Sequence, residues 1–219
     1  MPIATDTRIL LLDAAERLFA EAGFAATSLR NITAAAGMNL ASVNYHFGSK
    51  DALLEAVIQR RLAPVNDERL RRLDELEEQA GTEPLNLEQA LRCFLEPPFQ
   101  KMREWGESGR LFMRVVGRIQ SDTNPKMAAM FLKQFEETLK RFTSALQRAL
   151  PQLAPQEVSR RLHFVIGAMA HTLAWSEKIA LLCGQNHTEA LSSQLLEDLV
   201  QFAAAGMAAP VPTVDREEK

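Results

Sequence analysis

The stretch GMNLASVNYHFGSK, residues 37–50, places a turn-forming glycine shortly before a run of polar and aromatic side chains. An amide, a phenol and an imidazole follow one another at Asn44, Tyr45 and His46, and Lys50 adds a cation soon after them. Such groups donate or accept hydrogen bonds in defined directions, and a lysine can contact a phosphate. The stretch therefore has the composition of a surface that contacts a polar, anionic partner.

We predict a short helix on each side of the turn that begins at Gly37. Ser28 is a good N-cap for the first helix, and Leu29 and Ile32 give it an apolar face. The second helix runs from about residue 40 to 47. Two helices joined by a short glycine-bearing turn form a helix-turn-helix, whose second helix can lie in the DNA major groove. An ordinary helical hairpin is the alternative, because it shares this pattern.

The charge balance sets a condition on DNA binding. Residues 1–62 hold six Lys and Arg and six Asp and Glu, and the whole chain has a net charge of −3. These values exclude a strongly basic coat for nucleic acid, although they allow a local basic patch. DNA binding therefore requires the acidic side chains of the first helix to face away from the duplex.

The remaining sequence predicts an all-α chain, because no stretch alternates apolar and polar residues as a half-buried strand does. Asn124-Pro125 predicts the start of one long helix that reaches Leu150. Pro97-Pro98 and Gly106 predict interruptions, a further helix spans residues 155–182, and Thr188 caps the last one. The fold class is thus an N-terminal three-helix module that contains the helix-turn-helix, followed by a larger helical domain. The predicted domains are residues 1–50, residues 51–209 and a disordered tail at 210–219.

Several classes of protein are not supported by the sequence. No apolar run approaches the roughly 18 residues of a membrane span, and no secretory signal begins the chain, so we expect a cytoplasmic protein. Cys93 and Cys183 are far apart and match no metal or redox spacing. There is no nucleophile elbow, phosphate loop or metal-spaced cluster. We therefore expect no enzyme, no cofactor and no metal site.

Residues 9–54 resemble the DNA-binding module of the TetR family of bacterial transcriptional repressors. The resemblance rests on the segment ILLLDAAERLFAEAGFAATSLRNITAAAGMNLASVNYHFGSKDALL, including the glycine-phenylalanine after the first helix and the closing FGSKDALL. It implies that Ser28 and Arg30 approach phosphate or groove. It also implies groove-facing roles for Ser42, Asn44, Tyr45 and His46, and a phosphate contact for Lys50. The family often has tyrosine at the position of Asn44, so this residue is a candidate base reader.

The resemblance also implies a homodimer that binds a palindromic operator in double-stranded DNA. In this family the last two long helices pair with their symmetry mates into a four-helix bundle. Here those helices are residues 155–182 and 188–207, and their wide apolar stripes agree with burial on two sides. The function this predicts is a ligand-responsive repressor. The alternative is an all-helical small-molecule binding or carrier protein whose N-terminal hairpin does not bind DNA.

Large apolar side chains in the middle of the chain bear on the chemistry of the effector. Residues 162–176 contain no Asp, Glu, Lys or Arg, so a pocket along this helix would be dry. Each large side chain alone is more often core than pocket, but methionines and aromatics together can line an irregular cavity. The wording NLASVNYHFGSK is also similar to a fatty-acid-responsive sub-branch of the family. We therefore expect a hydrophobic effector, a fatty acid or an acyl thioester. His171 is either a polar anchor or a satisfied core histidine, and the predicted pocket residues are Phe99, Met102, Trp105, Phe112, Met113, Phe131, Met169, His171 and Leu173.

Overall fold

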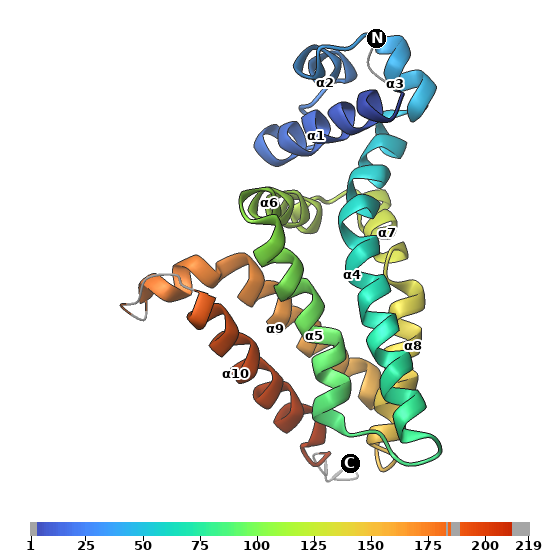
Figure 1. Ribbon diagram of the computed structural model, residues 1–219, viewed down its shortest axis with the longest axis vertical. Coiled ribbons are helices and arrows are strands. Elements are labelled where there is room, and N and C mark those ends of the chain that lie inside the picture. The colour runs from blue at the N-terminus through green and yellow to red at the C-terminus, as the bar shows by residue number, and fades with distance from the viewer. Residues whose placement is uncertain (1–3, 183, 185–188, 212–219) are drawn as a thin grey trace, which may run out of the picture. The chain divides into compact units, whose positions relative to one another are not determined.

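The computed structural model describes residues 4–182, 184 and 189–211, and its regular structure within them is entirely helical (Figure 1). This confirms the all-α prediction. The helices are α1 (Ala4–Ala22), α2 (Leu29–Ala36), α3 (Leu40–His46), α4 (Lys50–Ala80), α5 (Leu87–Trp105), α6 (Glu107–Ser121), α7 (Pro125–Lys133), α8 (Glu136–Ala149), α9 (Pro155–Leu182) and α10 (Glu189–Ala208).

The chain forms two compact units. The N-terminal unit comprises Met1–Glu68 and Gln100–Glu137, and the C-terminal unit comprises Arg69–Phe99 and Thr138–Lys219. Helices α6 and α7 thus belong to the same unit as the helix-turn-helix. Compactness does not establish which segments fold alone, so the domains predicted at 1–50 and 51–209 stay a prediction. Residues 212–219 of the predicted tail, and the predicted cap at Thr188, lie outside the described residues.

The core of the N-terminal unit joins the apolar faces of α1, α4 and α6. Helices α2 and α3 are short and add Ile32 and Val43, each 0% exposed. Their ends are capped as the sequence predicts. Ser28 Oγ accepts a hydrogen bond from the amide of Asn31, and Gly37 adopts the left-handed φ of 65° that lets α2 end. These caps and buried side chains hold the two helices of the motif in place.

The C-terminal unit has a separate core. The rings of Phe94 on α5 and Phe142 on α8 meet edge to face, with their centroids 5.0 Å apart. Val158 of α9 and Val200 of α10 are buried in the same cluster. Arg92 and Glu197 form a bidentate ion pair between α5 and α10, with N–O distances of 2.6 and 2.7 Å. Four helices are thereby packed together by apolar contact and one bidentate pair.

Helix α5 runs unbroken through Pro97 and Pro98, so the predicted interruption was wrong. Proline has no N–H, and the carbonyl of Phe94, four residues before Pro98, therefore lacks its helical donor. Arg69 on α4 supplies another donor, because its Nε lies 2.8 Å from that carbonyl oxygen. Both prolines and Arg69 are buried. Tertiary packing therefore overrides the local preference of proline.

Arg69 keeps its charge although it is only 1% exposed. Burial lowers the pKa of its guanidinium to about 9, which still leaves the group protonated at neutral pH. The guanidinium lies 4.2 Å from the centroid of the Phe94 ring, and Nη2 lies 3.4 Å from the sulfur of Met169. One arginine therefore contacts α5 and α9 from α4.

The helix expected from Pro125 to Leu150 is two helices, so that prediction was also wrong. It begins where predicted, with Asn124 as N-cap, but α7 ends at Lys133 and α8 begins at Glu136. The amides of Gln134 and Phe135 bond to carbonyls three residues back, which tightens the chain. Asn66 of α4 donates its side-chain amide to the carbonyl of Gln134 at 2.8 Å. A tertiary hydrogen bond thus takes a carbonyl that a continuous helix would use.

Candidate nucleic-acid interface

Helix α3 presents a polar face to solvent because its apolar side is anchored. Val43 is 0% exposed and fixes the helix in the core of the N-terminal unit. Tyr45, two residues further on, is 82% exposed, and Asn44 is exposed as well. Ser42 and His46 are half-buried, and the rings of Tyr45 and His46 meet edge to face at 5.0 Å. A large aromatic and an amide on the outside of a short helix suit base edges better than a core.

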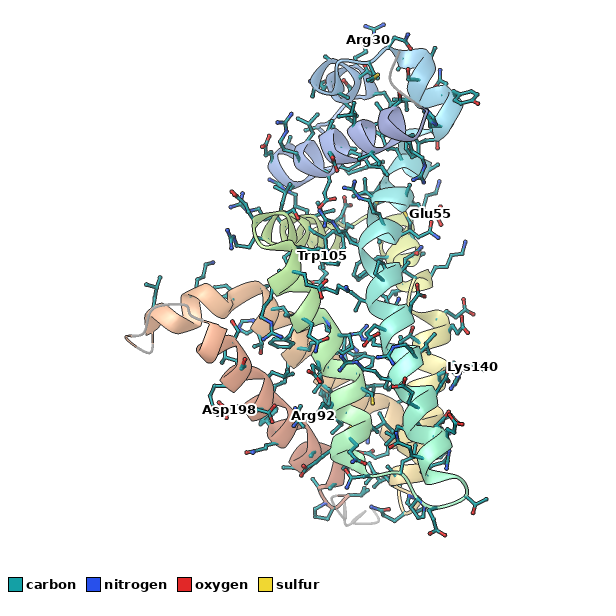
Figure 2. The ribbon with its side chains drawn as sticks, viewed as in Figure 1. Arg30, Glu55, Arg92, Trp105, Lys140 and Asp198 are labelled. Atoms are coloured by element: carbon teal, nitrogen blue, oxygen red, sulfur yellow. The ribbon has the colours of Figure 1, made fainter. Side chains whose placement is uncertain are left out.

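The start of α2 provides a second polar element of the candidate interface. Arg30 is exposed in the first turn of α2 (Figure 2). Ser28 is also exposed, but its hydroxyl oxygen already serves as the helix cap through Asn31. A helix N-terminus with free amide groups and a cation beside it favours an anion such as phosphate. The DNA contacts of both residues stay predictions.

Lys50 is held inside the module as well as being a candidate phosphate contact. Its Nζ lies 2.9 Å from the carbonyl oxygens of Phe24 and Thr27, and 4.2 Å from the centroid of the Phe24 ring. An ammonium group has three N–H donors, so one remains for a phosphate after these two bonds. Lys50 therefore pins the turn between α1 and α2, a role that the sequence did not indicate.

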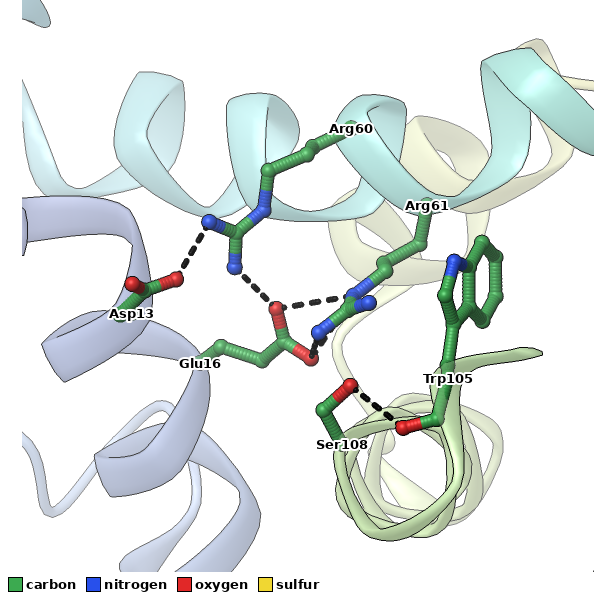
Figure 3. Close-up of polar contacts among 6 residues, drawn as sticks. All are labelled: Asp13, Glu16, Arg60, Arg61, Trp105 and Ser108. Atoms are coloured by element: carbon green, nitrogen blue, oxygen red, sulfur yellow. Dashed lines mark hydrogen bonds and ion pairs between the residues drawn. The ribbon is translucent and has the colours of Figure 1, made fainter. Parts of the chain in front are cut away.

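Acidic side chains of α1 are engaged by two arginines of α4. Glu16 is 1% exposed and forms ion pairs with both Arg60 and Arg61 (Figure 3). The distance from Arg61 Nη2 to Glu16 Oε1 is 2.9 Å. Asp13 pairs with Arg60 at 2.6 Å. Glu21 remains exposed near the C-terminal end of α1. Two acids of the first helix are thus neutralised within the unit, which weakens their repulsion of a duplex.

The predicted pocket residues do not form one cluster. Phe99, Met169 and Leu173 belong to or pack against the core of the C-terminal unit. His171 is exposed and stacks on Trp175, with ring centroids 5.4 Å apart. The other predicted residues lie in the N-terminal unit, where Phe112 and Phe131 pack with its core; they are Met102, Trp105, Phe112, Met113 and Phe131.

A small cavity lies in the described part of the N-terminal unit. It has a volume of about 20 Å³, which is room for about one water molecule. It is lined by Phe19, Phe24, Leu54, Val115, Arg118, Ile119, Asp122 and Met127. Among residues 4–182, 184 and 189–211, no group of three His, Cys, Asp or Glu could hold a metal ion. None of the described helices combines the length and the apolar character that crossing a membrane requires.

A helix-turn-helix with an exposed polar second helix, in a chain whose described regular structure is helical, is the arrangement of a DNA-binding transcriptional regulator. Residues 11–57 match the family of bacterial regulatory proteins called tetR, and residues 92–206 match the tetracyclin repressor-like C-terminal domain. The chain belongs to the TetR family, as the sequence predicted. Members of this family are DNA-binding transcription factors rather than enzymes.

Known proteins and structures show the same likeness. The chain is 41% identical over 64 residues to the transcriptional repressor KstR2 of Rhodococcus jostii, a match that covers 26% of this chain and 31% of that protein. The fatty acid degradation regulator FadR of Bacillus halodurans has a TM-score of 0.64 at 16% identity, over 93% of this chain and 97% of that one. A TetR-family regulatory protein from Rhodococcus RHA1 has a TM-score of 0.67 at 17% identity, over 94% and 98%. At these identities the structures establish the fold.

We predict that Asn44→Ala weakens binding to the cognate site by about 1–3 kcal/mol and relaxes preference at one base position. The reason is that an exposed amide on the anchored helix can make a bidentate contact with a base edge. The measurement compares the affinity for the cognate duplex with that for a scrambled duplex of equal length. Equal weakening on both would contradict base reading by this residue.

Lys50→Ala is expected to behave differently. Binding to all sequences should weaken alike, and the slope of log affinity against log salt should fall by about one for each half-site that the lysine serves. The thermal stability of the protein should fall as well, because two hydrogen bonds to the α1–α2 turn are lost. Lys101→Ala is a matched control, since Lys101 pairs with Glu104. An unchanged salt slope would refute the phosphate contact, and Lys50 would then have only the structural role of bonding to the α1–α2 turn.

Proposed function

We propose that the chain is a ligand-responsive repressor that acts in the bacterial cytoplasm and binds a palindromic operator as a homodimer. The observation that carries this proposal is the geometry of α3, on which buried Val43 leaves Asn44 and Tyr45 to face outward. One short helix contacts too few bases for useful specificity, so two copies related by a two-fold axis are needed. The repressor named KstR2, to which the chain is similar over 64 residues, supports this direction of control.

Exposed apolar residues on α9 and α10 support the homodimer. Phe164 on α9 is 65% exposed and Phe202 on α10 is 71% exposed, which is unusual for phenylalanine in a soluble helix. Trp175 at 43% and Leu181 at 77% extend the exposed side of α9. Gly167, exposed between Phe164 and Trp175, would let a second helix approach closely. A second copy of the same two helices would cover these side chains and complete a four-helix bundle.

The dimer predicts the form of the operator. Footprinting on the DNA that the protein selects from its own genome should protect two inverted half-sites. Their centres should lie about 34–36 Å apart, or a multiple of that distance, because two α3 helices must enter successive major grooves on one side of the duplex. Sedimentation of the complex should give two chains for each operator. One unsymmetrical half-site bound by a single chain would overturn the homodimer and the palindrome together.

The proposed effector is an elongated hydrophobic molecule, a fatty acid or an acyl thioester, bound in the C-terminal unit. Phe99 and Met169 are buried there in an apolar cluster, and Leu173 packs against it. Apolar burial contributes roughly 25 cal/mol per Å², so a pocket that opens in this cluster could bind an acyl chain with few polar contacts. The FadR neighbour is described as a regulator of fatty acid degradation, which supports this chemistry. The effector acts on DNA affinity only through its different affinities for two geometries of the dimer.

We predict that Met169→Glu and Leu173→Glu each abolish the effector response and spare DNA binding, because a charge in an apolar pocket repels an acyl chain. The measurement is release of a labelled operator duplex by a series of long-chain fatty acids and acyl thioesters. Gln156→Glu adds the same charge at an exposed position of α9 and is the control. A response that survives both changes would place the pocket elsewhere. Release by a small polar metabolite alone would refute the hydrophobic effector and leave the repressor intact.

A further inference from the structure

The corner between α5 and α6 holds Trp105 in a fixed position. Gly106 alone separates the two helices and adopts a φ of 53°, a value that favours glycine. The hydroxyl of Ser108 donates to the carbonyl of Trp105 at 3.0 Å. A Cβ added at Gly109 would lie 3.2 Å from Trp105 Cβ and 3.2 Å from the sulfur of Met102. The first turn of α6 therefore packs tightly against the end of α5.

The ring of Trp105 faces an arginine of α4. The guanidinium carbon of Arg61 lies 4.9 Å from the centroid of the indole (Figure 3). The same guanidinium donates through Nε to both carboxylate oxygens of Glu16, at 3.0 and 3.2 Å. A planar guanidinium that lies over an aromatic ring and bonds to both oxygens of a carboxylate has little freedom to turn. A shift of the indole therefore moves Arg61, and Arg61 moves the carboxylate of Glu16.

Glu16 passes this constraint to α1. Its carboxylate is 1% exposed and also receives Arg60, so it depends on the arginines of α4 for its charge compensation. Separating a buried carboxylate from such a partner costs much free energy. A movement of the two arginines is therefore expected to move α1 with them. Val43 of α3 and Ile32 of α2 are buried in the same core as the apolar face of α1. The orientation of α3, the helix proposed to read the DNA, thus depends on the position of Glu16.

We propose that Trp105 is a positioning residue for DNA reading, and that the contacts from Trp105 through Arg61 to Glu16 transmit a displacement of α5 to α1. The inference rests on the proposed function. It gives Trp105 a different role from the effector contact predicted from the sequence. Helix α5 also contributes Phe94 and Phe99 to the core of the C-terminal unit, in which the effector is proposed to bind. A change in that core therefore acts directly on the helix that ends at Trp105.

Reciprocity provides a test that needs no effector. If movement of α5 changes the position of α1, then holding α2 and α3 on DNA, and through their shared core α1, must change the surroundings of Trp105. The chain has two tryptophans, so Trp175→Phe leaves Trp105 as the only one and keeps an aromatic ring in the proposed dimer face. Sedimentation checks that this variant is still a dimer. This variant is titrated with the duplex that the protein selects from its own genome. Binding is followed by the anisotropy of a label on the DNA, and Trp105 by its emission and its quenching by acrylamide.

We expect the Trp105 signal to change in proportion to the DNA bound. Adding Glu16→Gln should remove that change while anisotropy still reports binding, at higher protein concentration. Arg61→Lys, which keeps the charge but not the planar fork, should have the same effect and serves if Glu16→Gln unfolds the module, as thermal unfolding would reveal. Glu75→Gln is the matched control, because it breaks an exposed pair between Arg71 and Glu75 on α4.

Three outcomes would count against the proposal. An unchanged Trp105 signal on fully bound DNA would overturn the transmission through Arg61. A signal change that persists in both Glu16→Gln and Arg61→Lys would overturn the role of Glu16. Absence of any DNA binding by anisotropy would overturn the proposed function itself, and the inference with it. The anisotropy measurement therefore separates failure of the regulator from failure of this contact path.

Discussion

Backbone carbonyl groups without a helical partner are the constraint on which much of this structure depends. An α-helix leaves its last four carbonyls unpaired, and every internal proline leaves one more. Such carbonyls accept hydrogen bonds from side chains, from water or from amides in a tighter turn. Here arginines of other helices are among the donors. Arg118 of α6 donates to the carbonyls of Ala20 and Glu21 at the end of α1, at 2.8 and 2.6 Å.

The same arrangement recurs in both units. Arg161 of α9 donates through Nη1 to the carbonyls of Met207 and Ala209 at the end of α10, at 2.7 and 2.5 Å. Arg69 compensates the carbonyl that Pro98 leaves unpaired within α5. A cation near a helix C-terminus is also favoured by the helix dipole, so the contacts of Arg118 and Arg161 combine hydrogen bonds with an electrostatic attraction. These bonds join helices that are distant in sequence, and they fix the relative positions of helices within each unit.

Lys50 brings this constraint to the candidate interface. Its ammonium group satisfies two carbonyls of the turn between α1 and α2, and the same lysine begins α4. The side chain that we propose as a phosphate contact therefore also stabilises this turn. The ion pairs of Glu16 have a similar double character, because they neutralise α1 and also hold it to α4. A module of short helices has few apolar residues, so polar contacts carry more of its geometry.

The sequence by itself determined the helical class, the helix-turn-helix with its caps at Ser28 and Gly37, and the family. These follow from local rules: apolar periodicity, capping chemistry and a long stretch of family resemblance. It also indicated the polar residues of α3, which lie on both sides of the buried Val43 in the sequence. Only the tertiary structure decided that α5 continues through its prolines, that Gln134 ends α7, and that Trp105 lies against Arg61. Each of these depends on a partner far along the chain, and no local pattern records which distant donor reaches a given carbonyl or ring.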